Sequence, residues 1–95
     1  MNMLSSNVKL KEQSFSVDFD VFELYIFINH ISVEYEHRNK GIATNVFKQI
    51  QDKYNLPLFL IAYETLLPFY TKLNFSVDGI EEDDYFLMKR DYIGE

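Results

Sequence analysis

A short basic loop with one glycine is the segment of this sequence best suited to chemistry. It runs from His37 to Ala43 as His-Arg-Asn-Lys-Gly-Ile-Ala, so that Arg38 and Lys40 place positive charge just before Gly41. An apolar stretch typical of a strand precedes the loop, and residues with helical spacing follow it. The first N–H groups of a helix lack partners and carry the positive end of its dipole, and a glycine lets a ligand approach the backbone closely. The loop predicts an anion site suited to a pyrophosphate; an ordinary solvated loop is the alternative.

Two motifs together resemble a known family. Arg38-x-x-Gly41-x-Ala43 resembles the acetyl-CoA loop of the GCN5-related N-acetyltransferases, (Gln/Arg)-x-x-Gly-x-(Gly/Ala), and Phe69 to Phe75 resembles their Phe-Tyr-x-Lys-Leu-Gly-Phe motif. The motifs have the family's order and approximate spacing, and the resemblance covers residues 22 to 90. It implies an α+β fold class and the acyl-CoA N-acyltransferase fold: a mixed, α/β/α-like central sheet with a βαβ cofactor-binding unit, truncated at the N-terminus.

The strands that would position the loop are predicted from hydrophobic alternation. Residues 22 to 33 give the strongest strand signal, and because Leu24 to Ile28 is apolar in both phases, a central strand covered on both faces is expected. Residues 8 to 19 also alternate as a strand, with a turn or bulge near residues 12 to 14. Asp18 to Asp20 suits a turn into the next strand.

The second half of the sequence predicts a right-handed βαβ unit and a closing pair of strands. A helix from Ile42 should end near Tyr54, because Asn55 suits a left-handed cap and Pro57 cannot continue the helix. Residues 58 to 62 are continuously apolar and indicate a buried parallel strand. A second helix is expected at about residues 66 to 73, with Asn74 following its end, and then strands at 75 to 77 and 85 to 90.

The resemblance implies acetyl-CoA as the acyl donor and gives roles to individual residues. The amides of Asn39, Lys40, Gly41, Ile42, Ala43 and Thr44, with Arg38, would bind the pyrophosphate of CoA. The backbone groups of Ile31 and Val33 would pair with the pantetheine arm as an added strand does, and an amide of that strand would polarise the thioester carbonyl. Tyr70 would protonate the departing thiolate, with ordinary core packing as the alternative.

The general base is left open by both motifs. His30 and Glu34 are the candidates, since His30 lies on the central strand and an imidazole titrates near neutral pH. Glu23, His37, a water relay, or packing as the only role of His30 are the alternatives.

Three departures from the family pattern concern the acceptor side. Asn74 replaces a glycine, which is mild because Asn tolerates the same backbone conformation, and Tyr63 replaces an asparagine carried by many members. The family's first strand and two helices, which wall the acceptor site, have no counterpart before residue 22. The site would then be open or completed by another subunit, and we expect a homodimer formed through residues 8 to 28 or 85 to 90.

Composition excludes several other function classes. The 95 residues predict a single domain, 1–95, and the net charge of −6 argues against nucleic-acid and anionic-membrane partners. With no cysteine, and with two histidines outside any metal-site spacing, no metal is expected. No nucleophile elbow or P-loop is present, and no apolar run reaches the ~18 residues of a membrane span. A soluble cytoplasmic protein is the expectation.

Two functions remain after these exclusions. The first is an N-acetyltransferase that moves an acetyl group to a primary amine, on a small molecule or a peptide, by direct attack on the thioester. The second is a degenerate acyl-CoA-binding or regulatory module without turnover. The acidic run Glu81 to Asp84 is a solvated turn or a surface that attracts a cationic amine.

Overall fold

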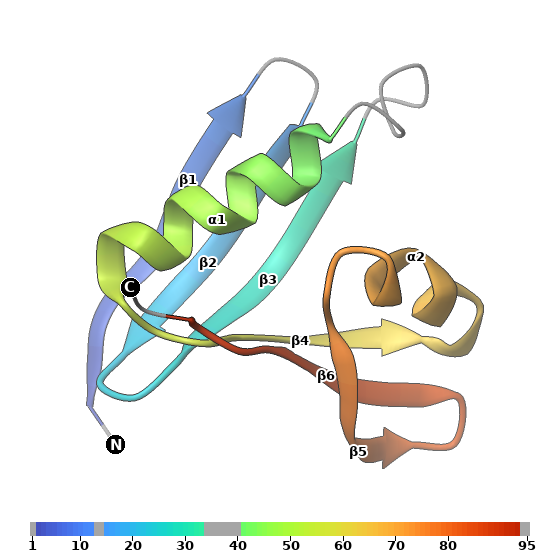
Figure 1. The fold of residues 1–95 in the computed structure, drawn as a ribbon. Helices are drawn as coiled ribbons and strands as arrows, with labels where there is room; N and C mark the ends of the chain where they lie inside the picture. The colour runs from blue at the N-terminus through green and yellow to red at the C-terminus, as the bar shows by residue number, and fades with distance from the viewer. Residues whose placement is uncertain (1, 13–14, 34–40, 94–95) are drawn as a thin grey trace.

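The computed structural model describes residues 2–12, 15–33 and 41–93 as one mixed sheet with helices packed on it. The elements in chain order are β1 (Met3–Glu12), β2 (Phe15–Phe22), β3 (Ile26–Val33), α1 (Ile42–Tyr54), β4 (Leu58–Tyr63), a short 3-10 helix (Glu64–Leu66), α2 (Leu67–Thr71), β5 (Ser76–Glu82) and β6 (Tyr85–Arg90). The six strands lie in the order β1-β2-β3-β4-β6-β5 (Figure 1). Because β3 and β4 are parallel and α1 joins them, the predicted βαβ unit is confirmed.

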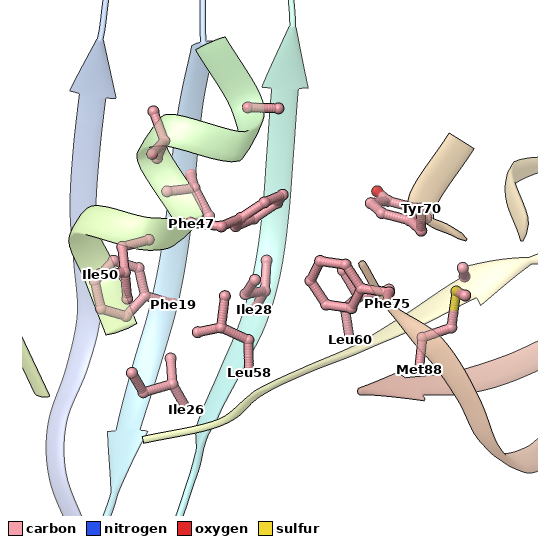
Figure 2. Packing of buried hydrophobic residues seen from close by; sticks show 14 of the residues in the cluster. Phe19, Ile26, Ile28, Phe47, Ile50, Leu58, Leu60, Tyr70, Phe75 and Met88 are labelled. Carbon is pink, nitrogen blue, oxygen red and sulfur yellow. The ribbon is translucent and has the colours of Figure 1, made fainter. Parts of the chain in front are cut away.

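One face of the sheet carries the core. In β2 every second residue is buried beneath α1, and α1 returns a buried stripe at helical spacing, which includes Val46, Phe47 and Ile50. The Phe47 ring makes edge contacts with Phe15 and Phe75, at centroid distances of 5.6 and 5.2 Å. Figure 2 shows how Phe47 and Ile50 of the helix meet the apolar side chains of the strands below.

The opposite face of the sheet is not covered by a helix in the described part of the chain. Phe75 contacts both Phe47 of α1 and Tyr70 of α2, so the two helices lie on the same side. Ile61 and Tyr63, which point to the other side, are each 42% exposed. The predictions of a central strand covered on both faces and of a strand buried throughout residues 58 to 62 are therefore wrong. No helix within the described ranges is long and apolar enough to cross a membrane.

The turn between β2 and β3 lies later in the sequence than predicted. Asp18 and Asp20 are inside β2, where they alternate with buried residues, and the turn falls at Glu23 to Tyr25, closed by a bond from Phe22 N to Tyr25 O of 2.8 Å. The apolar alternation of β2 outweighs the turn preference of its aspartates. Leu24 lies in this turn and is 67% exposed, so β3 begins at Ile26 and not at residue 22.

The end of α1 agrees with the sequence prediction, whereas α2 ends at Thr71, two residues before the predicted end at Leu73. Asn55 has φ 57° and its N–H donates to Gln51 O at 2.7 Å, which ends α1 with a left-handed residue. Asn74, with φ 70°, follows the second helix in the same conformation. Phe75 N then donates to Tyr70 O at 3.1 Å, which turns the chain into β5.

A buried polar cross-link ties α1 to the closing strand. Gln51 Nε2 donates to Arg90 O at 3.0 Å and to Leu56 O at 3.3 Å, and Gln51 Oε1 accepts from Arg90 Nη1. Arg90 Nε donates to Leu73 O at 2.9 Å, next to the end of α2. Burial lowers the pKa of Arg90, and the nearby Asp52 carboxylate acts in the opposite direction. The cross-link therefore holds together the two halves of the sheet on the helix side.

Gln51→Leu is expected to destabilise the protein by about 2–4 kcal/mol, because a side chain of similar volume leaves the Arg90 carbonyl and guanidinium without their buried partner. Urea unfolding measures the change. The control is Asp91→Asn, which removes only the exposed ion pair with Lys89 (3.0 Å) and should cost less than about 1 kcal/mol. Equal losses in the two variants would contradict a structural role for Gln51.

Candidate functional site

The parallel strands β3 and β4 separate soon after they begin. They pair only at Ile26 with Leu58 and Phe27 with Phe59, although the strands contain 8 and 6 residues. On its other side β4 pairs with β6 along its whole length. In Figure 1, β3 and β4 visibly diverge. Within the described residues no strand occupies the remaining edge of β3, so a gap opens toward the carboxyl ends of both strands.

The free edge of β3 presents the backbone of Ile31 and Val33 to this gap. Ile26 N donates to Pro57 O at 2.9 Å, so the backbone groups of Ile26 face β4 and those of Phe27 face β2. A bulge at Asn29 then reverses the alternation, because the register runs from Phe19 opposite Ile28 directly to Asp18 opposite His30. Ile31 and Val33 consequently direct their N–H and C=O groups away from β2.

The amino end of α1 lies beside the end of β3 and is open. Gly41 precedes the helix with φ 74°, and no side chain among the described residues caps it. The first bonded amide is Asn45 N, which donates to Gly41 O at 3.1 Å, so the N–H groups of Ile42, Ala43 and Thr44 have no partner within the helix. Among the described residues outside its chain neighbours, no atom lies within 4 Å of a Cβ built on Gly41, which leaves room for a ligand on that side.

Tyr70 lies across the gap from β3, on α2. Its ring is 9% exposed and packs edge-on against Phe69 and Phe75, with centroids 5.0 and 5.6 Å away. In Figure 2 the hydroxyl end of the ring points toward β3 and away from Met88. Burial raises the pKa of Tyr70, so its phenol remains protonated at neutral pH and is available as a donor. The ring is packed in the core while its hydroxyl faces the gap.

The structure describes some of the other candidate residues and not others. His30 is exposed on the face of β3 opposite α1, next to the bulge. Tyr63 ends β4 on that same face and packs edge-on against Tyr85 at 5.3 Å. Glu34, Arg38, Asn39 and Lys40 lie outside the described residues.

Comparison with known proteins identifies the fold. No protein-family model and no curated protein sequence matches the chain. The crystal structure of the anti-CRISPR protein AcrVA5 superposes with a TM-score of 0.69 at 22% identity, and the PaiA N-acetyltransferase from Thermoplasma acidophilum in complex with coenzyme A with 0.67 at 16%. An acetyltransferase from Bacillus cereus gives 0.65 at 19%. The chain has the fold of the GCN5-related N-acetyltransferases. The predicted acyl-CoA N-acyltransferase fold is thereby confirmed.

The matches differ in how much of each GCN5-related fold the chain spans. The match to the PaiA enzyme takes in 82% of this chain but only 53% of that enzyme. The match to the B. cereus acetyltransferase takes in 95% of this chain and 73% of that protein. The match to AcrVA5 takes in 88% of this chain and 97% of that protein.

Sequence reasoning missed two features of this GCN5-related fold. Asp18 was assigned to a turn, although the period-2 alternation of residues 15 to 21 already favoured a strand with Asp18 on its open face. The link between Gln51 and Arg90 joins residues 39 positions apart, and no local pattern announces it.

Proposed function

We propose that the chain transfers an acetyl group from acetyl-CoA to a primary amine by direct attack of the amine on the thioester. The gap between β3 and β4 carries this proposal, because a free strand edge and an uncapped helix amino end meet at the same side of it. A strand edge can pair with the amide-bearing pantetheine arm, and the helix end suits its diphosphate. The PaiA enzyme of the same fold is in complex with coenzyme A, which supports this assignment.

The residues present fit two parts of CoA, its diphosphate and its pantetheine arm. The diphosphate would be held by the amides of Ile42, Ala43 and Thr44 above Gly41, and by Arg38, Asn39 and Lys40 according to the family motif. The pantetheine would lie along Ile31 and Val33. An N–H of that strand would stabilise the oxygen that becomes negative during attack.

The reaction then needs two proton transfers. The amine nitrogen attacks the carbonyl carbon, the N–C bond forms and the C–S bond breaks. Tyr70 would give its phenolic proton to the CoA thiolate and regain one from solvent. The proton lost by the amine would go to His30, to Glu34 or to water.

The acceptor would approach from the sheet face that has no helix. Both helices lie on the other face, where the helix end would hold the diphosphate, so the thioester is reached from the uncovered side. The acidic run Glu81 to Asp84, at the end of β5 and in the turn after it, borders Tyr85 and favours a cationic amine there. A small-molecule amine and a lysine of a peptide both fit an open site.

The alternative proposal is an acyl-CoA-binding or regulatory module without turnover. The uncovered acceptor face and the 53% coverage of the PaiA enzyme favour it. CoA would bind as described above, and the exposed face would have no amine to position.

Acetyl-CoA turnover with a panel of acceptors separates the two proposals. Polyamines, aminoglycosides, arylamines and lysine peptides form the panel, with CRISPR effector proteins added because AcrVA5 is named as an anti-CRISPR protein. Thiol release and acceptor mass are measured together. An acceptor that gains the mass of one acetyl group supports transfer. Tight CoA binding without product supports the module. The absence of both binding and product would contradict both proposals.

We also propose that the chain forms a homodimer. Its sheet has free edges at β1 and β5, and Met3, Leu4, Val77 and Ile80 on those strands are exposed. Because β6 lies inside the sheet, the predicted contact through residues 85 to 90 would involve its open face and not an edge. Light scattering at micromolar concentration is expected to give twice the 11.3 kDa chain mass, and a monodisperse monomer would contradict the dimer.

A further inference from the structure

Three charged or titratable side chains form a row across the uncovered face of the sheet. Lys9 of β1 lies opposite Asp18 of β2, and Asp18 lies opposite His30 of β3. All three belong to the face away from α1, since Asp18 alternates with the buried Val17 and Phe19. Directly opposed residues have Cβ atoms about 4.5–5.5 Å apart, within reach of a side-chain interaction.

Asp18 is the unusual member of this row. Its Oδ1 is buried and has no hydrogen-bond partner among the described residues. The neighbouring Asp20, by contrast, accepts a bond of 2.8 Å from Asn7 N. A buried carboxylate oxygen without a donor is costly, so Asp18 calls for a partner with an N–H group.

His30 is the donor best placed to bond to Asp18 while lying next to the gap. The bulge at Asn29 puts His30 on the open face, and the next residue, Ile31, already directs its backbone into the gap. A hollow of about 370 Å³ lined in part by Lys9, Lys11, Ser16, Asp18 and His30 leaves the imidazole room to turn. An imidazole that donates from one ring nitrogen to a carboxylate keeps the other nitrogen free to accept a proton.

We propose that Asp18 is a positioning residue that holds the His30 imidazole as the general base for the acceptor amine. This inference rests on the proposed acetyl transfer and names the base that the family resemblance leaves open. As the amine nitrogen bonds to the carbonyl carbon and the C–S bond breaks, its proton passes to the free nitrogen of His30 and then to solvent. The CoA sulfur takes its proton from Tyr70, so the products are the amide and the free thiol.

The charged groups around the pair come from two strands. Lys9 and Lys11 of β1 and Asp20 of β2 share this face with it, and across the gap β4 presents Ile61 and Tyr63. No ion pair joins Asp18 to Lys9 or to His30 within the described residues. Lys9 places a positive charge on the β1 side of Asp18, and His30 lies on its β3 side.

The pairing is tested without any substrate. Nitrogen-15 NMR of the imidazoles reports which ring nitrogen carries the proton, and His30→Gln assigns the signals, since the chain has two histidines. One dominant His30 tautomer is expected in the unmodified protein and in Ser32→Ala, a control on the same strand and face. Asp18→Asn should change that tautomer ratio. An unchanged ratio in Asp18→Asn, or the same change in Lys9→Gln, would overturn the pairing.

The role as a base is tested by the pH profile of kcat/KM. His30→Gln should lower kcat/KM by about 10²-fold, and Asp18→Asn by about tenfold. An acid limb that reports the His30 imidazole should be absent from His30→Gln. An acid limb that stays unchanged in His30→Gln overturns the base role. Absence of transfer by the unmodified protein contradicts the proposed function itself, and the imidazole spectra distinguish that failure from a failure of the pairing.

Discussion

Gly41→Asp is expected to raise the Kd for CoA by about 10³-fold, because it puts a carboxylate where the diphosphate would bind. No atom of the described residues beyond the chain neighbours lies within 4 Å of the added Cβ, so the new side chain would occupy the proposed ligand space without displacing them. Two like charges about 4 Å apart repel by about 4 kcal/mol near a protein surface, and every 1.4 kcal/mol is tenfold in affinity. Calorimetric titration with CoA measures the change.

Gly41→Asn is the matched control for this substitution. Residue 41 has φ 74°, which both Asn and Asp tolerate better than other side chains, so the two variants carry similar backbone strain. They differ in charge, and the difference in affinity between them isolates the electrostatic part. That difference should shrink as salt is added. Equal Kd values for the Asp and Asn variants, or for all three proteins, would place the diphosphate elsewhere.

The strand, helix and helix ends around the proposed cofactor site could be predicted from the sequence because their signals are local. Gly41 and the helical spacing after it mark a strand-to-helix loop, and Asn55 and Asn74 mark the ends of the two helices. Each of these predictions depends on a few consecutive residues whose backbone preferences the fold does not oppose.

The acceptor half could not be predicted in the same way because it depends on register. The bulge at Asn29 reverses which residues of β3 face the gap, and only pairing with β2 reveals it. The row from Lys9 through Asp18 to His30 likewise requires three strands to be aligned before it exists. Apolar residues in both phases at Leu24 to Ile28 predicted a strand covered on both faces, whereas Leu24 lies in a turn and one face is open.

Tyr70→Phe is expected to lower kcat by about 10²-fold while leaving the affinity for CoA nearly unchanged, because the hydroxyl acts only when the thiolate leaves. The phenyl ring keeps the edge contacts with Phe69 and Phe75, so the packing around residue 70 is retained. Tyr54→Phe is the control, since Tyr54 also packs edge-on, against Phe19 at 6.1 Å, and lies at the far end of α1. Single-turnover measurements separate the chemical step from product release.

The pH dependence distinguishes an acid at Tyr70 from a packing residue. An exposed tyrosine has a pKa of about 10. Burial raises the pKa of Tyr70 above this value, so its phenol stays protonated at every pH at which an exposed tyrosine is protonated. An alkaline fall in kcat that reports this group should therefore begin above the usual tyrosine range and should be absent from Tyr70→Phe. If Tyr70→Phe turns over as fast as Tyr54→Phe, the thiolate takes its proton from water. The edge-on packing of Tyr70 against Phe75, and through it Phe47, would then be its whole contribution: it would hold α2 against α1 on one side of the gap.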